Sequence, residues 1–172
     1  MIEPYMKLAD RAAAQSEGRE RDLRAGIACL DRAIQLAPDN WGALWIRGKA
    51  FQSLGDHRGA VDAFGRAFQI QSNNPDVGRE LVVELLETNS LQRAVAVSEQ
   101  LAARYPDNAG LRANLALARL LAHDLPGAAK DIDEALRLDP RDPITKALKQ
   151  RIAEISAGHR PQPQSYRELE AG

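Results

Sequence analysis

The sequence contains little cysteine and few aromatic side chains, and both shortages restrict the kinds of site it can hold. Cys29 is the only cysteine among 172 residues, so neither an intrachain disulfide framework nor a cysteine-based metal site is available. Because Cys29 lies in the apolar-periodic stretch GIACLDRAI, we expect it to be a small buried hydrophobe. Aromatic residues make up 5% of the chain and hydrophobic residues 44%, so aliphatic side chains and alanine must fill the core.

An excess of one charge and long apolar runs are also absent. The 23 basic and 24 acidic side chains give a formal net charge of -1, without a polybasic tail, so we expect no nucleic-acid partner. No segment is apolar over the length that spans a bilayer, and the N-terminal stretch lacks the apolar core of a signal peptide. We therefore expect no membrane partner and a cytoplasmic protein. A signal peptide preceding Met1 would change that compartment.

One short phrase recurs along the chain. LAPDN, RYPDN and LDPRD contain Pro38, Pro106 and Pro140, which lie 68 and 34 residues apart. A further copy is expected near residue 72, where the chain reads IQSNN and Ser72 replaces the proline. The period is therefore 34 residues. It divides the sequence, without insertion or deletion, into four blocks: 7–40, 41–74, 75–108 and 109–142.

Two positions in every block hold side chains that cap helix N-termini. Position 34 is occupied by Asn40, Asn74, Asn108 and Asp142, and position 16 by Asp22, Asp56, Ser90 and Asp124. Each block is therefore predicted to form two helices that begin near its positions 1 and 17. Position 15 lies in the turn between them, where Gly55 and Asn89 readily adopt a left-handed backbone and Arg21 and His123 fit less easily.

Small residues recur where the paired helices would cross. They occupy position 8 as Ala14, Gly48, Val82 and Ala116, and position 20 as Gly26, Ala60, Ala94 and Ala128. The period and the stretch GKAFQSLGDHRGAVDAF resemble the tetratricopeptide repeat, with Gly48, Phe51, Ala60 and Phe64 at its pattern positions. The resemblance covers residues 7–142 and implies an all-α fold, a right-handed superhelical solenoid of antiparallel helix pairs.

We expect one solenoid domain over residues 1–157. Ile144, Leu148 and Ile152 recur at helical spacing, which predicts a capping helix over residues 143–157. The tail, residues 158–172, contains HRPQPQSYRELEAG, and its prolines and low apolar content predict disorder. The alternative is that SYRELEA serves as a ligand for a neighbouring groove.

The pattern contains no group of residues typical of catalysis. His57 and His123 lie in equivalent turns two repeats apart, roughly 20 Å by the spacing of packed helices, too far to share a metal ion. Glu80, Glu84 and Glu87 fall on one side of a helix, and we expect a solvated face there, with an acidic contact site as the alternative. We predict no enzyme activity, no metal and no cofactor.

The family resemblance implies a concave groove lined by the first helix of each repeat, mainly by its positions 2, 5, 6, 9, 12 and 13. The residues that we expect to contact a partner there are Trp45, Ile46, Lys49, Arg79, Glu80, Val83, Asn114, Leu117 and Leu121. Trp45 follows the core position taken by Leu44, and the alternative is that its ring packs onto the first repeat. Asp76 and Glu80 have the wrong sign for the carboxylate clamp of co-chaperones.

These observations predict a protein or peptide partner. The expected function is that of an adaptor or assembly factor, which holds an extended peptide or a partner helix in the groove. The alternative is a self-assembling scaffold, a homo-oligomer formed through the fourth repeat and the capping helix. It would bury the apolar strip formed by Ala113, Leu117, Leu120 and Leu121.

Overall fold

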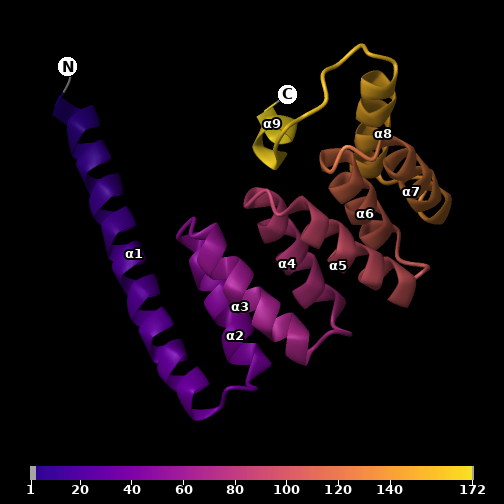
Figure 1. The fold of residues 1–172 in the computed structure, drawn as a ribbon. Helices are drawn as coiled ribbons and strands as arrows, with labels where there is room; N and C mark the ends of the chain where they lie inside the picture. The colour runs from indigo at the N-terminus through magenta and orange to yellow at the C-terminus, as the bar shows by residue number, and fades with distance from the viewer. Residues whose placement is uncertain (1–2, 172) are drawn as a thin grey trace. The chain divides into compact units, whose positions relative to one another are not determined.

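The computed structural model describes the backbone of residues 3–171 and the side-chain surroundings of residues 16–169. Within these residues the chain forms α-helices and no strand, which confirms the predicted all-α fold. Figure 1 shows the helices: α1 (Glu3–Leu36), α2 (Trp41–Ser53), α3 (His57–Ile70), α4 (Pro75–Glu87), α5 (Leu91–Arg104), α6 (Ala109–Leu121), α7 (Leu125–Leu138), α8 (Pro143–Ser156) and α9 (Tyr166–Ala171).

The chain divides into two compact units, residues 1–67 and residues 68–172. The single domain over residues 1–157 stays a prediction. Tandem repeats bury their apolar faces against their nearest neighbours, which favours such local units.

Most of the predicted helix caps form. Six cap side chains accept a hydrogen bond from a backbone amide in the first turn of the helix that follows: Asn40, Asn74, Asn108, Asp142, Asp56 and Asp124. Ser90 makes no such bond, and its hydroxyl lies 3.2 Å from that of Thr88. The helices therefore begin where the sequence predicts, because the exposed amides at each start find a nearby acceptor.

The first block departs from the predicted helix pair. α1 continues as a single 34-residue helix through Arg21 and Asp22, where a turn and a cap were expected. Glu20 and Arg24 form an ion pair of 2.7 Å at i,i+4 spacing across the expected turn, which supports the helix. Cys29 is exposed and not buried as predicted.

The turn forms in the other three blocks because one residue adopts a left-handed backbone. The φ angles are 70° for Gly55, 55° for Asn89 and 65° for His123. A side chain such as that of Arg21 pays roughly 1–2 kcal/mol in this conformation, whereas arginine is a good helix former. The blocks that form a helix pair thus differ from the first block, which forms a single long helix, in the residue at the turn.

The first unit is held together by a close helix crossing and by one arginine. The buried ring of Phe64 on α3 lies against Gly48 on α2, as the pattern of small residues predicts. Arg47 on α2 forms ion pairs with Asp31 on α1 at 2.6 Å and with Asp62 on α3 at 3.4 Å. A single guanidinium thus connects the three helices of this unit.

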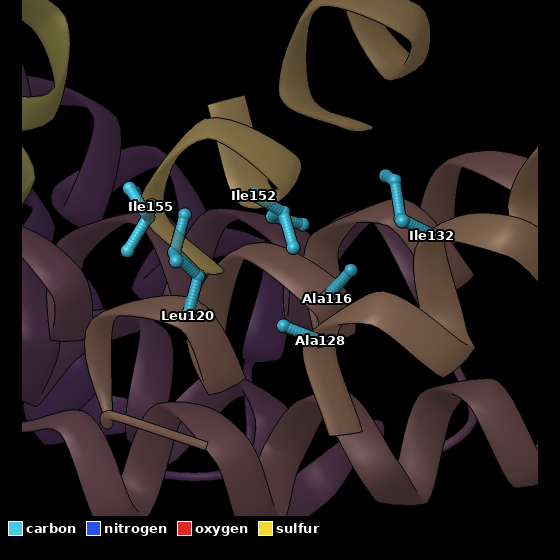
Figure 2. Packing of buried hydrophobic residues seen from close by; sticks show 6 residues of the cluster. All are labelled: Ala116, Leu120, Ala128, Ile132, Ile152 and Ile155. Atoms are coloured by element: carbon cyan, nitrogen blue, oxygen red, sulfur yellow. The ribbon is translucent and has the colours of Figure 1, made fainter. Parts of the chain in front are cut away.

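The second unit has an aliphatic core to which the capping helix contributes. Figure 2 shows six buried side chains that meet where α6, α7 and α8 pack: Ala116, Leu120, Ala128, Ile132, Ile152 and Ile155. Ala116 and Ala128 are the small residues predicted at positions 8 and 20 of the fourth block, and both are fully buried. The predicted capping helix is present as α8, and its apolar face completes this core.

The tail, for which disorder was predicted, ends in a short helix in this structure. Residues 159–165 follow α8 as an irregular segment and lead into α9. Pro163 is buried and Leu169 packs against the core of the second unit, so two apolar side chains help to hold the segment. Among the described residues, no helix combines the length and the apolar character needed to cross a membrane.

The contact between Gly48 and Phe64 leads to a stability prediction. A Cβ atom at position 48 would lie 2.5 Å from the buried Phe64 ring, so Gly48→Ala should lower the free energy of unfolding by about 1–3 kcal/mol. Gly26→Ala is the control, because the exposed Gly26 lies within α1 with no neighbour within 4 Å, and alanine there should stabilise by about 0.5–1 kcal/mol. Urea denaturation of both variants measures the difference, and equal destabilisation would contradict the crossing.

Candidate functional site

In the first unit, the predicted contact residues lie on α2, the first helix of the second repeat. Ile46 on α2 is 52% exposed, and Trp45 and Lys49 are half-buried. An open cleft of about 700 Å³ lies between α1 and α2, and its apolar lining includes Leu23, Leu30 and Ile46. Ile46 is thus an exposed residue beside a cleft, and its contact with a partner stays a prediction.

Trp45 has an unusual polar environment. The Nε1–H of its indole is buried and has no hydrogen-bond acceptor among the described residues. Lys49, one helical turn further along α2, donates from Nζ to Oε1 of Gln52 at 2.5 Å. The first unit thus combines a half-buried aromatic ring, an apolar cleft and a tethered ammonium group.

The second unit contains the other predicted contact residues, on α4 and α6, which pack against each other. Arg79 is exposed and pairs with Asp76 at 2.6 Å, whereas Glu80 and Val83 are half-buried. On α6, Asn114 and Leu117 are half-buried. The structure thus brings five of the predicted residues onto two packed helices of this unit.

Leu121 does not lie on the surface where it was predicted. Its side chain is 0% exposed, so it cannot line a surface that contacts a partner. Leu121 is the last residue of α6, where the turn to α7 follows directly and the neighbouring helices cover it. Leu121 is therefore part of the core of its unit.

In the second unit, the tail covers part of the surface of α4 and α6, the first helices of the third and fourth repeats. α9 contacts α4, and Arg167 Nε lies 3.3 Å from Oε2 of Glu87, the last residue of α4. A pocket of about 380 Å³ is lined by Leu117 of α6, by Leu148 of α8 and by Tyr166 and Leu169 of the tail. A predicted contact residue therefore lies beside a segment of its own chain.

The three glutamates of α4 do not form the solvated face that we expected. Glu84 is only 1% exposed, and Glu87 is mostly buried and paired with Arg167. Their helix packs against α5 and α6 and contacts α9, so the side that carries these carboxylates is largely covered. The alternative of an acidic contact site stays a prediction, and Glu84 is too buried to take part in it. Sequence spacing identified the acidic side but carried no signal for the basic residue 80 positions later.

The carboxylate of Asp131 is buried and forms ion pairs with two arginines of its own chain. Arg112 and Arg119, both on α6, approach it at 3.2 Å and 2.5 Å. A hydrogen bond to Glu99 and the charge of Asp131 raise the pKa of the Arg119 guanidinium above its ordinary value, although burial opposes this. Arg119 thus joins α5, α6 and α7 through charged contacts. Among residues whose side chains are described, no three His, Cys, Asp or Glu side chains are grouped so as to hold a metal ion.

Comparison with known proteins gives one family. The family model of the tetratricopeptide repeat matches residues 11–75 and 79–143. General transcription factor 3C polypeptide 3 of Homo sapiens is 22% identical over 103 residues, which are 57% of this chain and 11% of that protein. The chain thus spans about a tenth of the length of this curated relative.

Two solved structures resemble the chain over most of its length. A MamA protein, the RS-1 ArsTM double mutant, has a TM-score of 0.70 at 19% identity and covers 94% of this chain and 90% of its own. YrrB, a TPR protein described as having an unusual peptide-binding site, has a TM-score of 0.68 at 16% identity, with 97% of this chain and 82% of its own covered. At these identities the likeness concerns the fold.

The start of the tail is attached to α8 through Glu154. Gln150 Nε2 donates to Glu154 Oε1 at 2.9 Å, and Arg160 Nε donates to Oε2 at 3.1 Å. The hydrogen bond from Gln150 and the charge of Arg160 lower the pKa of Glu154 below its ordinary value, although partial burial opposes this. Because the folded pKa is depressed, this contribution to stability is present above the unfolded pKa, about 4.3, and is lost as the pH falls through the folded pKa.

The pKa of Glu154 can be measured directly. We expect Gln150→Ala to raise it, because the variant removes the largest stabilising hydrogen bond to the carboxylate. Lys149→Ala, on the same helix, is the control and should leave it nearly unchanged, since Lys149 pairs with Asp133. Carbon-detected NMR titration of the side-chain carboxyl provides the measurement. An unchanged pKa in Gln150→Ala would show that this hydrogen bond is absent in solution.

Proposed function

Because the chain belongs to the tetratricopeptide repeat family, whose repeats are generically protein–protein interaction modules, we propose that it is a non-catalytic adaptor or assembly factor. It binds an extended peptide or a partner helix on the first-helix surfaces of its two units. The observation that carries this proposal is the exposed Ile46 at an apolar cleft between α1 and α2. Large apolar side chains beside such clefts are typical anchors of protein interfaces.

Each unit contributes a different chemistry to recognition. In the first unit, Ile46 and the cleft accept an aliphatic or aromatic side chain, and the unpaired indole N–H of Trp45 donates to a carbonyl oxygen of the partner once the ring shifts. In the second unit, Arg79 and Asp76 provide an exposed ion pair at the start of α4, and the half-buried Val83 provides apolar contact. A partner with apolar side chains interspersed with charges fits both surfaces.

Ile46→Lys tests the cleft. We expect the variant to bind the partner at least about tenfold more weakly, because a central apolar anchor contributes more than about 1.4 kcal/mol to binding. Leu36→Lys is the matched control, since Leu36 is 76% exposed in the same unit, outside the residues that line the cleft. The partner is first captured from lysate of the native host, and calorimetry then measures its affinity for each folded variant. Full affinity in Ile46→Lys would contradict the proposal.

Self-assembly through the fourth repeat and α8 is the second candidate. Of its apolar strip, Leu120 and Leu121 are fully buried within their own chain and Ala113 packs against the core, which counts against a second copy there. The observation that favours it is Ile144 on α8, which is 78% exposed. A scaffold would bury the Ile144 side chain against a second copy, whereas an adaptor would leave it in solvent.

The mass in solution separates the two candidates. We expect a monomer whose mass does not change with concentration in sedimentation equilibrium, because most of the strip is already covered. A concentration-dependent dimer that disappears in Ile144→Lys would favour the scaffold, since an unpaired lysine at an apolar interface is costly. Ile46→Lys is the control in this experiment and should not alter the mass.

A further inference from the structure

The C-terminal segment lies against the surface to which the proposed function assigns partner binding in the second unit. Figure 1 shows the chain leaving α8, forming a loop and ending in α9, which contacts α4. Glu87, paired with Arg167, occupies position 13 of the third repeat, and Leu117, beside Tyr166 and Leu169, occupies position 9 of the fourth. Both positions belong to the set that lines the groove.

Contacts of three kinds hold the segment. Arg151 on α8 donates to the backbone carbonyl of Leu169, and Gln162 Nε2 donates to the carbonyl of Leu120 on α6 at 2.5 Å. The Leu169 side chain packs against the core cluster, and Arg167 pairs with Glu87. Backbone hydrogen bonds, one apolar anchor and one charge pair are the elements by which short peptides are recognised.

This attachment is weak and leaves space beside it. α9 has six residues, too few for a helix that is stable by itself, and the Arg167 side chain is 73% exposed, so its ion pair contributes little. The pocket of about 380 Å³ that contains Tyr166 and Leu169 is not filled by them. A segment with larger apolar side chains would bury more surface at the same place than α9 does.

We propose that α9 is an internal competitor for the peptide-binding surface of the second unit, an inference that rests on the proposed function. The segment that displaces it has the same chemistry: a short helix with an aliphatic side chain in the place of Leu169 and, two residues earlier, a basic side chain for Glu87. Because α9 is covalently attached, its effective concentration is high despite its few contacts. The apparent affinity for such a segment is its intrinsic affinity multiplied by the fraction of molecules in which α9 has left the surface.

Binding of a tail peptide to the full-length chain tests this competition. The probe is a fluorescein-labelled peptide of residues 159–171, HRPQPQSYRELEA. Leu169→Asp in the full chain removes the apolar anchor of α9, and we expect the peptide to bind this variant at least about tenfold more tightly than wild type. Leu36→Asp, an equally drastic change at an exposed leucine of the other unit, should bind like wild type. Circular dichroism verifies that all three proteins are folded.

Charge reversal identifies the surface. In the same assay, a peptide carrying Arg167→Glu should bind the Leu169→Asp protein more weakly, and Glu87→Arg in that protein should restore part of the loss. Should Leu169→Asp prove unfolded, Arg167→Glu in the full chain replaces it, because that side chain is exposed. Equal peptide affinity of wild type and the released variants, or no binding to any of them, would overturn the inference. The proposed function would then still be decided by Ile46→Lys in the first unit.

Discussion

The backbone conformation of one residue per repeat determines how much of this chain folds into helix pairs. A 34-residue block makes two antiparallel helices only if the residue before the second cap turns left-handed, and Gly55, Asn89 and His123 do so. Where Arg21 occupies that place, the helix continues and α1 runs through the whole first block. A left-handed backbone costs a residue other than glycine on the order of 1–2 kcal/mol. His123 adopts it despite this cost, whereas Arg21 remains helical in an unbroken α1.

The unbroken α1 has a direct consequence for the first unit. In a folded pair, the first helix of the block would cover the face of the second, but here Gly26 is exposed with no neighbour within 4 Å of a Cβ atom. Leu30 lines the cleft that this leaves beside α2, together with Ile46. Arg47 attaches α1 to α2 through its ion pair with Asp31. The candidate binding cleft and the departure from the repeat pattern thus have one cause.

Local features of this fold could be predicted from the sequence, and non-local ones could not. Caps such as Asn40 and Asn74 act on amides three residues away, so their spacing alone located the helices. Ile46 and Arg79 are exposed, as their places on one helix face indicate, and their contact with a partner stays a prediction. Leu121 was misplaced because the neighbouring helices bury it, and the docking of the tail escaped prediction because Glu87 and Arg167 are 80 residues apart. Periodicity carries no signal for such pairs.

The same physical feature that lets repeats stack also allows the tail to bind. Each repeat presents an apolar first-helix face that the next element covers, and at the C-terminal end that element is α8, followed by the much shorter α9. A six-residue helix covers less of Leu117 and its neighbours than a full repeat helix would, so the surface is protected from solvent without being filled. In the proposed competition, this partial cover keeps apolar side chains from associating non-specifically and yields to a segment that fits better. The proposal thus makes access of a partner depend on the weakness of the last contact in the array.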